Sequence, residues 1–85
     1  MAQYVPPPEN DILPAFPDAR KVRPKTWFSG GGMRRRWRDD NHIYEWDYQH
    51  GHVEVYDSRG HHVGAFDPNT GLQLKSAVPS RRVEP

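Results

Sequence analysis

Residues 44–56 constrain the fold most, because they read as two short strands joined near a glycine. Their sequence, Tyr-Glu-Trp-Asp-Tyr-Gln-His-Gly-His-Val-Glu-Val-Tyr, alternates apolar and polar side chains on both sides of Gly51. Alternation with period two is the pattern of a half-buried β-strand. A two-residue loop at His50-Gly51 would place Asp47 opposite Glu54. The segment therefore predicts a hairpin with one apolar face and one polar face.

The two faces of this hairpin differ in their chemistry. One face gathers the side chains that would attach it to a core, namely Tyr44, Trp46, Tyr48, Val53 and Val55. The other face would lie open to solvent and carries Glu45, Asp47, Gln49, His52, Glu54 and Tyr56, with His50 at the tip. A register shifted by one residue would mix the two sets, so the clean separation supports the hairpin.

Composition limits the rest of the chain. Eighty-five residues with a mean hydropathy of −1.02 allow one domain with a small core. The expected core residues are mostly aromatic: Trp27, Trp37, Trp46 and Phe66. The absence of cysteine excludes disulfides and thiolate chemistry. No apolar run reaches the roughly 18 residues of a membrane span, so we expect no membrane-spanning segment.

Charge is divided along the chain. Residues 20–38 contain eight Lys or Arg residues and no acid, whereas residues 39–67 contain seven acids and one Arg. A basic segment beside an acidic, histidine-bearing one is typical of a polyanion-binding surface next to a site of different chemistry. A solvated charge run with no partner is the alternative.

The order of turn and strand signals predicts a mainly β (α+β) fold. Residues 1–26 hold six of the nine prolines and predict an extended arm or linker with a short helical segment, attached through Ile12, Leu13 and Phe16. Residues 27–85 are expected to form the domain, a small and strongly twisted antiparallel sheet. Its first strand, 33–38, would place Arg34, Arg36 and Arg38 on one face. Arginines interleaved with Trp37 would suit RNA, because arginines contact phosphates and an aromatic ring stacks on bases.

The polar face of the hairpin carries an acid–base set. Asp47, His50 and Glu54, with His52 nearby, can supply a general base and a general acid near neutral pH. Beside arginines, such a set suits attack of an RNA 2′-hydroxyl on its adjacent phosphodiester, which needs no metal and no cofactor. Metal binding by the His50/His52 and His61/His62 pairs is the alternative, although their spacing matches no specific motif. The residues alone indicate an RNA binder and allow a ribonuclease.

Several long motifs resemble one family, the cytotoxic ribonuclease domain of E-group colicins and cloacin. The similar segments cover roughly residues 24–83 and include Gly-Gly-Gly-Met-Arg-Arg-Arg-Trp at 30–37, Ile-Tyr-Glu-Trp-Asp at 43–47, Gln-His-Gly at 49–51 and Gly-Ala-Phe-Asp-Pro-Asn-Thr-Gly at 64–71. The resemblance implies a metal-independent endoribonuclease that cuts 16S rRNA at the decoding site of the 30S ribosomal subunit. It also implies an acidic cognate immunity protein, a larger toxin secreted or displayed by the producer bacterium, and action in the target-cell cytoplasm.

The resemblance also implies roles for individual residues. It makes Glu54 the base, His50 the acid, Asp47 the residue that orients the histidine, and Arg81 or the adjacent Arg82 the stabiliser of phosphate charge. It places Tyr44, Tyr56 and Lys75 near the substrate. His52 departs from the family pattern, because an acid is expected there. Two other readings stay open: a ribonuclease of the same fold acting on tRNA or another RNA, and a non-catalytic RNA-binding module.

Overall fold

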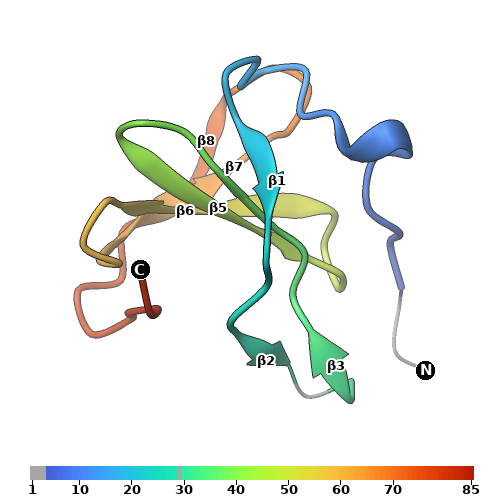
Figure 1. Ribbon diagram of the computed structural model, residues 1–85. Coiled ribbons are helices and arrows are strands. Elements are labelled where there is room, and N and C mark those ends of the chain that lie inside the picture. The colour runs from blue at the N-terminus through green and yellow to red at the C-terminus, as the bar shows by residue number, and fades with distance from the viewer. Residues whose placement is uncertain (1–3, 29) are drawn as a thin grey trace.

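A six-stranded antiparallel sheet forms the body of the protein, and a two-stranded ribbon stands beside it (Figure 1). The computed structural model describes residues 4–28 and 30–85. In the sheet the strand order is β1-β4-β5-β6-β7-β8, while β2 pairs with β3 in the ribbon. The elements are η1 (Glu9–Asp11), β1 (Arg20–Val22), β2 (Trp27–Phe28), β3 (Gly32–Met33), β4 (Arg36–Arg38), β5 (His42–Asp47), β6 (His52–Asp57), β7 (His62–Phe66) and β8 (Gln73–Ser76). The predicted mainly β fold with a short helical segment near the N-terminus is confirmed.

Strands β5 and β6 form the predicted hairpin in a different register. Asp47 lies opposite His52, and Glu54 lies opposite Glu45, so the predicted pairing of Asp47 with Glu54 is wrong by two residues. The loop has four residues, 48–51, because Asp47 itself closes the turn: its carbonyl accepts the N–H of Gly51 at 2.9 Å. A shift of two residues preserves the side of every strand residue, so the two faces contain the predicted strand side chains.

The polar face of the hairpin is covered, which corrects the expectation that it lies open to solvent. Glu45 is fully buried and Glu54 is 4% exposed. The tail that follows β8 folds back over this face, where His61 pairs with Arg82 in an isolated bridge and Val83 donates its N–H to the Gly60 carbonyl. The segment nearest the C-terminus therefore ends close to β6 (Figure 1).

The apolar face of the sheet is covered by the proline-rich arm. Leu13 is 2% exposed and belongs to the core, and Phe16 packs against that core. Two buried indoles bind the arm backbone: Trp46 Nε1 donates to the Val5 carbonyl at 2.9 Å, and Trp37 Nε1 donates to the Asp11 carbonyl at 2.8 Å. The core thus takes residues from both the arm and the sheet.

Two residues that were expected to be buried, one in the core and one in the arm, are exposed. Trp37 and Trp46 are buried as predicted, but Trp27 is 72% exposed on the ribbon and Ile12 is 58% exposed. Phe66 is only partly buried against the core. Leu13 and Phe16 do attach the arm to the core as predicted, whereas Ile12 does not.

The expected strand 33–38 is divided into β3 and β4. Arg34 and Arg35 lie between them, outside both strands. The Arg34 N–H donates to the Thr26 carbonyl, and the Arg35 carbonyl accepts the N–H of Trp46. Arg34 therefore does not continue the row of Arg36 and Arg38.

Among the described residues, no helix has the length and apolar character needed to cross a bilayer.

Candidate active site

Asp47 and His50 form a pair at the end of β5. The Oδ2 atom of Asp47 lies 2.9 Å from Nδ1 of His50, and its Oδ1 atom accepts the backbone N–H groups of Gln49 and His50. Burial works against ionisation of Asp47, but hydrogen bonds from the His50 side chain and from these N–H groups outweigh it and lower the Asp47 pKa below 3.8. An ionised Asp47 accepts a hydrogen bond from Nδ1–H of this half-exposed imidazole, which leaves Nε2 for another partner.

This arrangement predicts a pH-dependent contribution of Asp47 to stability. Since folding lowers the Asp47 pKa, its stabilisation is present above about pH 4 and is lost as the pH falls through the folded-state value. Asp47→Asn is expected to reduce the free energy of unfolding by about 1–2 kcal/mol at pH 7. Urea unfolding at pH 7 and pH 3 should show the difference from the parent shrinking at the lower pH. A pH-independent difference would contradict this explanation, and the exposed Asp40→Asn is the matched control.

Glu54 lies in a second cluster, with His62 and Arg81. Glu54 Oε1 is 2.8 Å from His62 Nε2 and 3.5 Å from Arg81 Nη1. The Val78 N–H donates to His62 Nδ1 at 2.9 Å, so Nδ1 is an acceptor and the proton of a neutral His62 lies on Nε2 and points to Glu54. Arg81 also donates from Nε to the Tyr56 hydroxyl at 3.0 Å. The tail therefore brings a guanidinium to a buried carboxylate.

Sequence reasoning missed His62 as a partner of Glu54. The only signal was the adjacent pair His61-His62, which the alternation pattern could not assign to a face. A bulge between Val55 and Tyr56 shifts the β6–β7 register and sets His62 opposite Tyr56. Bulges of this kind depend on contacts between distant segments, so a single-strand pattern does not reveal them.

His52 adds a second imidazole beside the Asp47–His50 pair. Its ring stacks on that of His50 with centroids 5.7 Å apart and planes 22° apart. Its Nδ1 atom is buried and has no hydrogen-bond partner among the described residues. Two imidazoles thus share the end of the hairpin where the family pattern led us to expect one imidazole and one acid.

Aromatic rings hold the loop that carries His50. Tyr48, the first loop residue, stacks between Phe28 of β2, at 4.8 Å and 15°, and Tyr4 of the arm, at 5.6 Å and 24°. The Val5 N–H also donates to the Tyr48 carbonyl at 2.6 Å. The arm, the ribbon and the loop therefore meet at Tyr48.

Three residues expected to contact RNA are buried in this structure. Trp37 is fully buried and Arg36 is 2% exposed. Tyr44 is 3% exposed on the apolar face, where its hydroxyl donates to Asp39. None of the three presents its side chain to a ligand in this structure.

The other three expected RNA contacts lie in different places. Arg34 is partly exposed and donates weakly to the Trp46 carbonyl at 3.5 Å. Lys75 is exposed on edge strand β8. Tyr56 is buried, but its hydroxyl meets Arg81, and burial raises the Tyr56 pKa while Arg81 opposes that rise.

The buried Arg36 belongs to a structural ion pair with Glu45. Its Nη2 and Nε atoms lie 2.8 and 3.1 Å from Glu45 Oε2, which also accepts the Thr26 hydroxyl at 2.6 Å. Arg36 Nη1 donates to the Glu84 carbonyl at 2.7 Å. Glu45 Oε1 is buried and has no partner among the described residues. The pair therefore ties β4, β5, the ribbon and the tail together.

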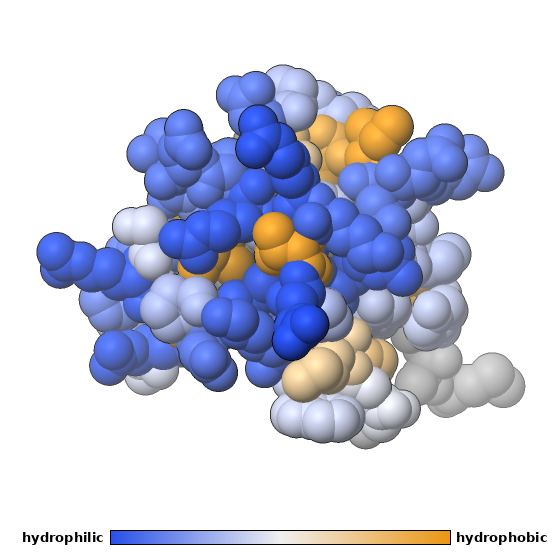
Figure 2. Space-filling view, in the orientation of Figure 1, coloured by the Kyte–Doolittle hydropathy of each residue, from blue (hydrophilic) through white to orange (hydrophobic). Residues whose placement is uncertain are grey.

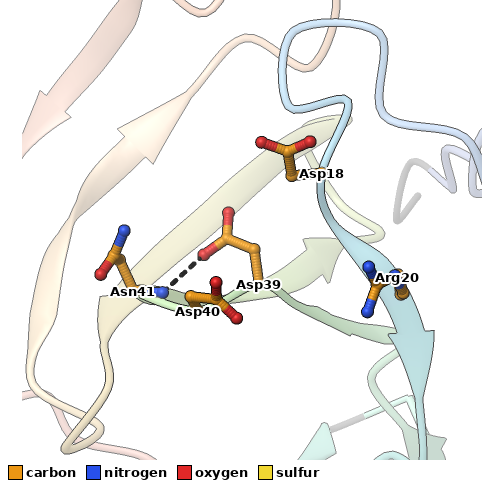
Figure 3. A pocket seen from close by; sticks show the side chains of 5 residues that line it. All are labelled: Asp18, Arg20, Asp39, Asp40 and Asn41. Atoms are coloured by element: carbon orange, nitrogen blue, oxygen red, sulfur yellow. Dashed lines mark hydrogen bonds between the residues drawn. The ribbon is translucent and has the colours of Figure 1, made fainter.

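A pocket of about 340 Å³ lies away from these clusters, at the β4–β5 turn (Figure 3). Its lining includes three carboxylates, and Asp39 among them accepts the N–H groups of Asn41 and His42. Carboxylates repel phosphate, and the oxygens of Asp39 are occupied by the turn, so this pocket does not fit a polyanion. Within residues 4–28 and 30–85, no group of three or more His, Asp or Glu side chains is arranged to hold a metal ion.

The small sheet thus joins carboxylates, imidazoles and a tail guanidinium on one face. The family model described as Cytotoxic matches residues 5–84, and the chain belongs to that family. The chain is 45% identical to colicin E3 and 44% identical to cloacin, both from Escherichia coli, with 95% of the chain aligned in each case. Colicin-E6 from the same organism is 42% identical. The resemblance to E-group colicins is therefore confirmed, and the chain spans 15% of the length of these relatives.

Proposed function

We propose that this domain is a metal-independent endoribonuclease that cleaves 16S rRNA at the decoding site of the small ribosomal subunit. The observation that carries the proposal is the arrangement of Glu54 with Arg81, on the same sheet face as the Asp47–His50 pair. Base, acid and cation are the three groups that 2′-hydroxyl transesterification requires. The membership of the Cytotoxic family, with colicin E3 and cloacin as relatives, supports the choice of ribosomal RNA.

In the proposed mechanism Glu54 accepts the proton of the 2′-hydroxyl. Oε1 of Glu54 is engaged with His62 and Arg81, which leaves Oε2 for this proton. The 2′-oxygen then bonds to phosphorus and the bond from phosphorus to the 5′-oxygen breaks. A protonated His50, held by Asp47, donates a proton to the departing 5′-oxygen. Arg81 stabilises the added negative charge of the transition state, and the products are a 2′,3′-cyclic phosphate and a 5′-hydroxyl.

The proposal extends to the setting in which the domain acts. Because the chain spans 15% of its relatives' length, we infer that a longer toxin, secreted or displayed by its producer, delivers it to the cytoplasm of a target cell. An acidic cognate immunity protein would protect the producer. Four exposed cations close together in the sequence, Arg20, Lys21, Arg23 and Lys25, support an acidic partner of this kind.

The test uses intact ribosomes in the presence of EDTA. The expected result is one cut in 16S rRNA at the decoding site, with a 2′,3′-cyclic phosphate on the upstream fragment and a 5′-hydroxyl on the downstream one. A parallel reaction with total tRNA should yield no specific fragments. Fragments of tRNA alone would indicate a same-fold ribonuclease with another target. Binding to ribosomes without scission would indicate a non-catalytic RNA-binding module.

A further inference from the structure

Trp27 is the exposed tryptophan of the described residues. It is 72% exposed, whereas Trp37 and Trp46 are 0% and 3% exposed. Trp27 begins β2, and the β2–β3 ribbon projects away from the six-stranded sheet (Figure 1). Its cross-strand neighbour is Met33, and the next residue, Phe28, is held against Tyr48. The ribbon therefore presents a large aromatic ring to solvent from an anchored position.

A basic pocket lies beside the segment that leads into the ribbon. It has a volume of about 190 Å³ and is lined by Val22, Arg23, Lys25, Arg36, Arg38 and Pro85. Arg36 is neutralised by Glu45. Lys25 donates from Nζ to the Pro85 oxygen at 2.6 Å and lies 3.9 Å from the Glu84 carboxylate. Arg23 and Arg38 form no ion pair with any carboxylate in residues 4–28 and 30–85. Two cations are thus available to an anion at this pocket.

The strand register places the basic pocket on the same sheet face as the candidate active site. Val22 lies opposite Arg36 and Arg36 opposite Glu45, which in turn lies opposite Glu54. Directly opposite residues of neighbouring strands share a face, so this row runs from the pocket to Glu54. Two strand spacings, about 10 Å, separate the strand of Arg36 from that of Glu54. The face of the molecule that Figure 2 displays is predominantly hydrophilic, with separate apolar patches.

We propose that Trp27 and the basic pocket form an RNA-docking surface beside the active site. Trp27 stacks on an unpaired base of the substrate, and Arg23 and Arg38 contact its phosphates. An exposed aromatic ring next to unpaired cations is the combination that single-stranded RNA binding uses, because stacking and phosphate contact work together. RNA is favoured over an acidic protein because the pocket lies on the same sheet face as the candidate site for a phosphodiester, and because the exposed ring of Trp27 offers a base a stacking partner. The inference rests on the proposed function, since it takes RNA as the substrate.

The test measures RNA binding separately from RNA cleavage. The probe is a single-stranded RNA of about a dozen nucleotides, the scale of one binding site for single-stranded RNA. It carries 2′-O-methyl groups, so it lacks the 2′-hydroxyl nucleophile of the proposed reaction and is not cleaved. Acrylamide quenching of intrinsic fluorescence reports mainly on Trp27, because the other two indoles are buried. Saturating RNA should protect this fluorescence. Trp27→Ala should weaken binding about tenfold or more, and Trp27→Phe should retain most of it.

Two further measurements complete the test. Arg38→Ala should reduce the slope of log affinity against log salt by about one. Leu72→Ala, which removes an exposed apolar side chain from another part of the surface, should leave affinity unchanged. Unprotected Trp27 fluorescence, or equal affinity of Trp27→Ala and the parent, would overturn the proposal. Equal protection by poly-L-glutamate would overturn it as well, because the surface would then be a general polyanion or acidic-protein site. Protection without cleavage of unmodified ribosomal RNA would instead overturn the proposed function and leave this surface in place.

Discussion

Glu54→Gln is expected to lower the rate of rRNA cleavage by roughly a hundredfold or more, the usual cost of removing a general base. Glutamine keeps the shape of the side chain. It also keeps an oxygen that can accept a hydrogen bond from Nε2–H of His62, which lies 2.8 Å from Glu54 Oε1. It cannot take a proton from a 2′-hydroxyl. Single-turnover cleavage of 16S rRNA in excess domain measures the chemical step, and circular dichroism checks that the sheet is intact.

His50→Ala should cause a loss of similar size through the other proton transfer. The His50 side chain is 43% exposed, and its removal leaves the backbone N–H bonds to Asp47 in place, so we expect it to cost less stability than Asp47→Asn. Glu9→Gln is a matched control, because Glu9 is an exposed carboxylate of the arm. Full activity in both Glu54→Gln and His50→Ala would remove these residues from the mechanism.

Arg36→Met should have the largest effect on stability, about 3–5 kcal/mol in the free energy of unfolding. The substitution leaves Glu45 charged and fully buried, with the Thr26 hydroxyl as its remaining partner. It also releases the Glu84 carbonyl, which Arg36 Nη1 binds at 2.7 Å. Urea unfolding monitored by fluorescence measures the change.

A second substitution separates the buried charge from the lost packing. Glu45→Gln in the Arg36→Met background removes the uncompensated charge and should restore part of the stability. Arg34→Met is the matched control, since Arg34 is more exposed and makes only a 3.5 Å bond. If Arg36→Met and Arg34→Met unfold at the same urea concentration, the buried pair does not stabilise the fold.

The alternation of side chains was enough to predict the two faces of the β5–β6 hairpin and the mainly β fold. It was not enough to predict the register, because Asp47 closes the turn with its own carbonyl and carboxylate and lengthens the loop by two residues. A two-residue shift leaves the pattern unchanged, so no argument from alternation could detect it.

Burial on the polar face was harder to foresee. It results from the tail, whose contacts with Gly60, His61 and Tyr56 span many residues of sequence. Single-segment patterns carry no information on such contacts. The same limit explains why Arg36 and Trp37 looked available to RNA, whereas Trp27 looked like a core residue.

The position of Arg81 late in the chain has a consequence for synthesis of the toxin. A polypeptide emerges from the ribosome N-terminus first, so the arm and the strands β1 to β8 are made before Arg81. The bridge between His61 and Arg82 and the bond from Val83 to Gly60 form later still. In the proposed mechanism the cation that stabilises the transition state therefore joins the site last. On that mechanism, a nascent chain that has not reached Arg81 would lack this cation.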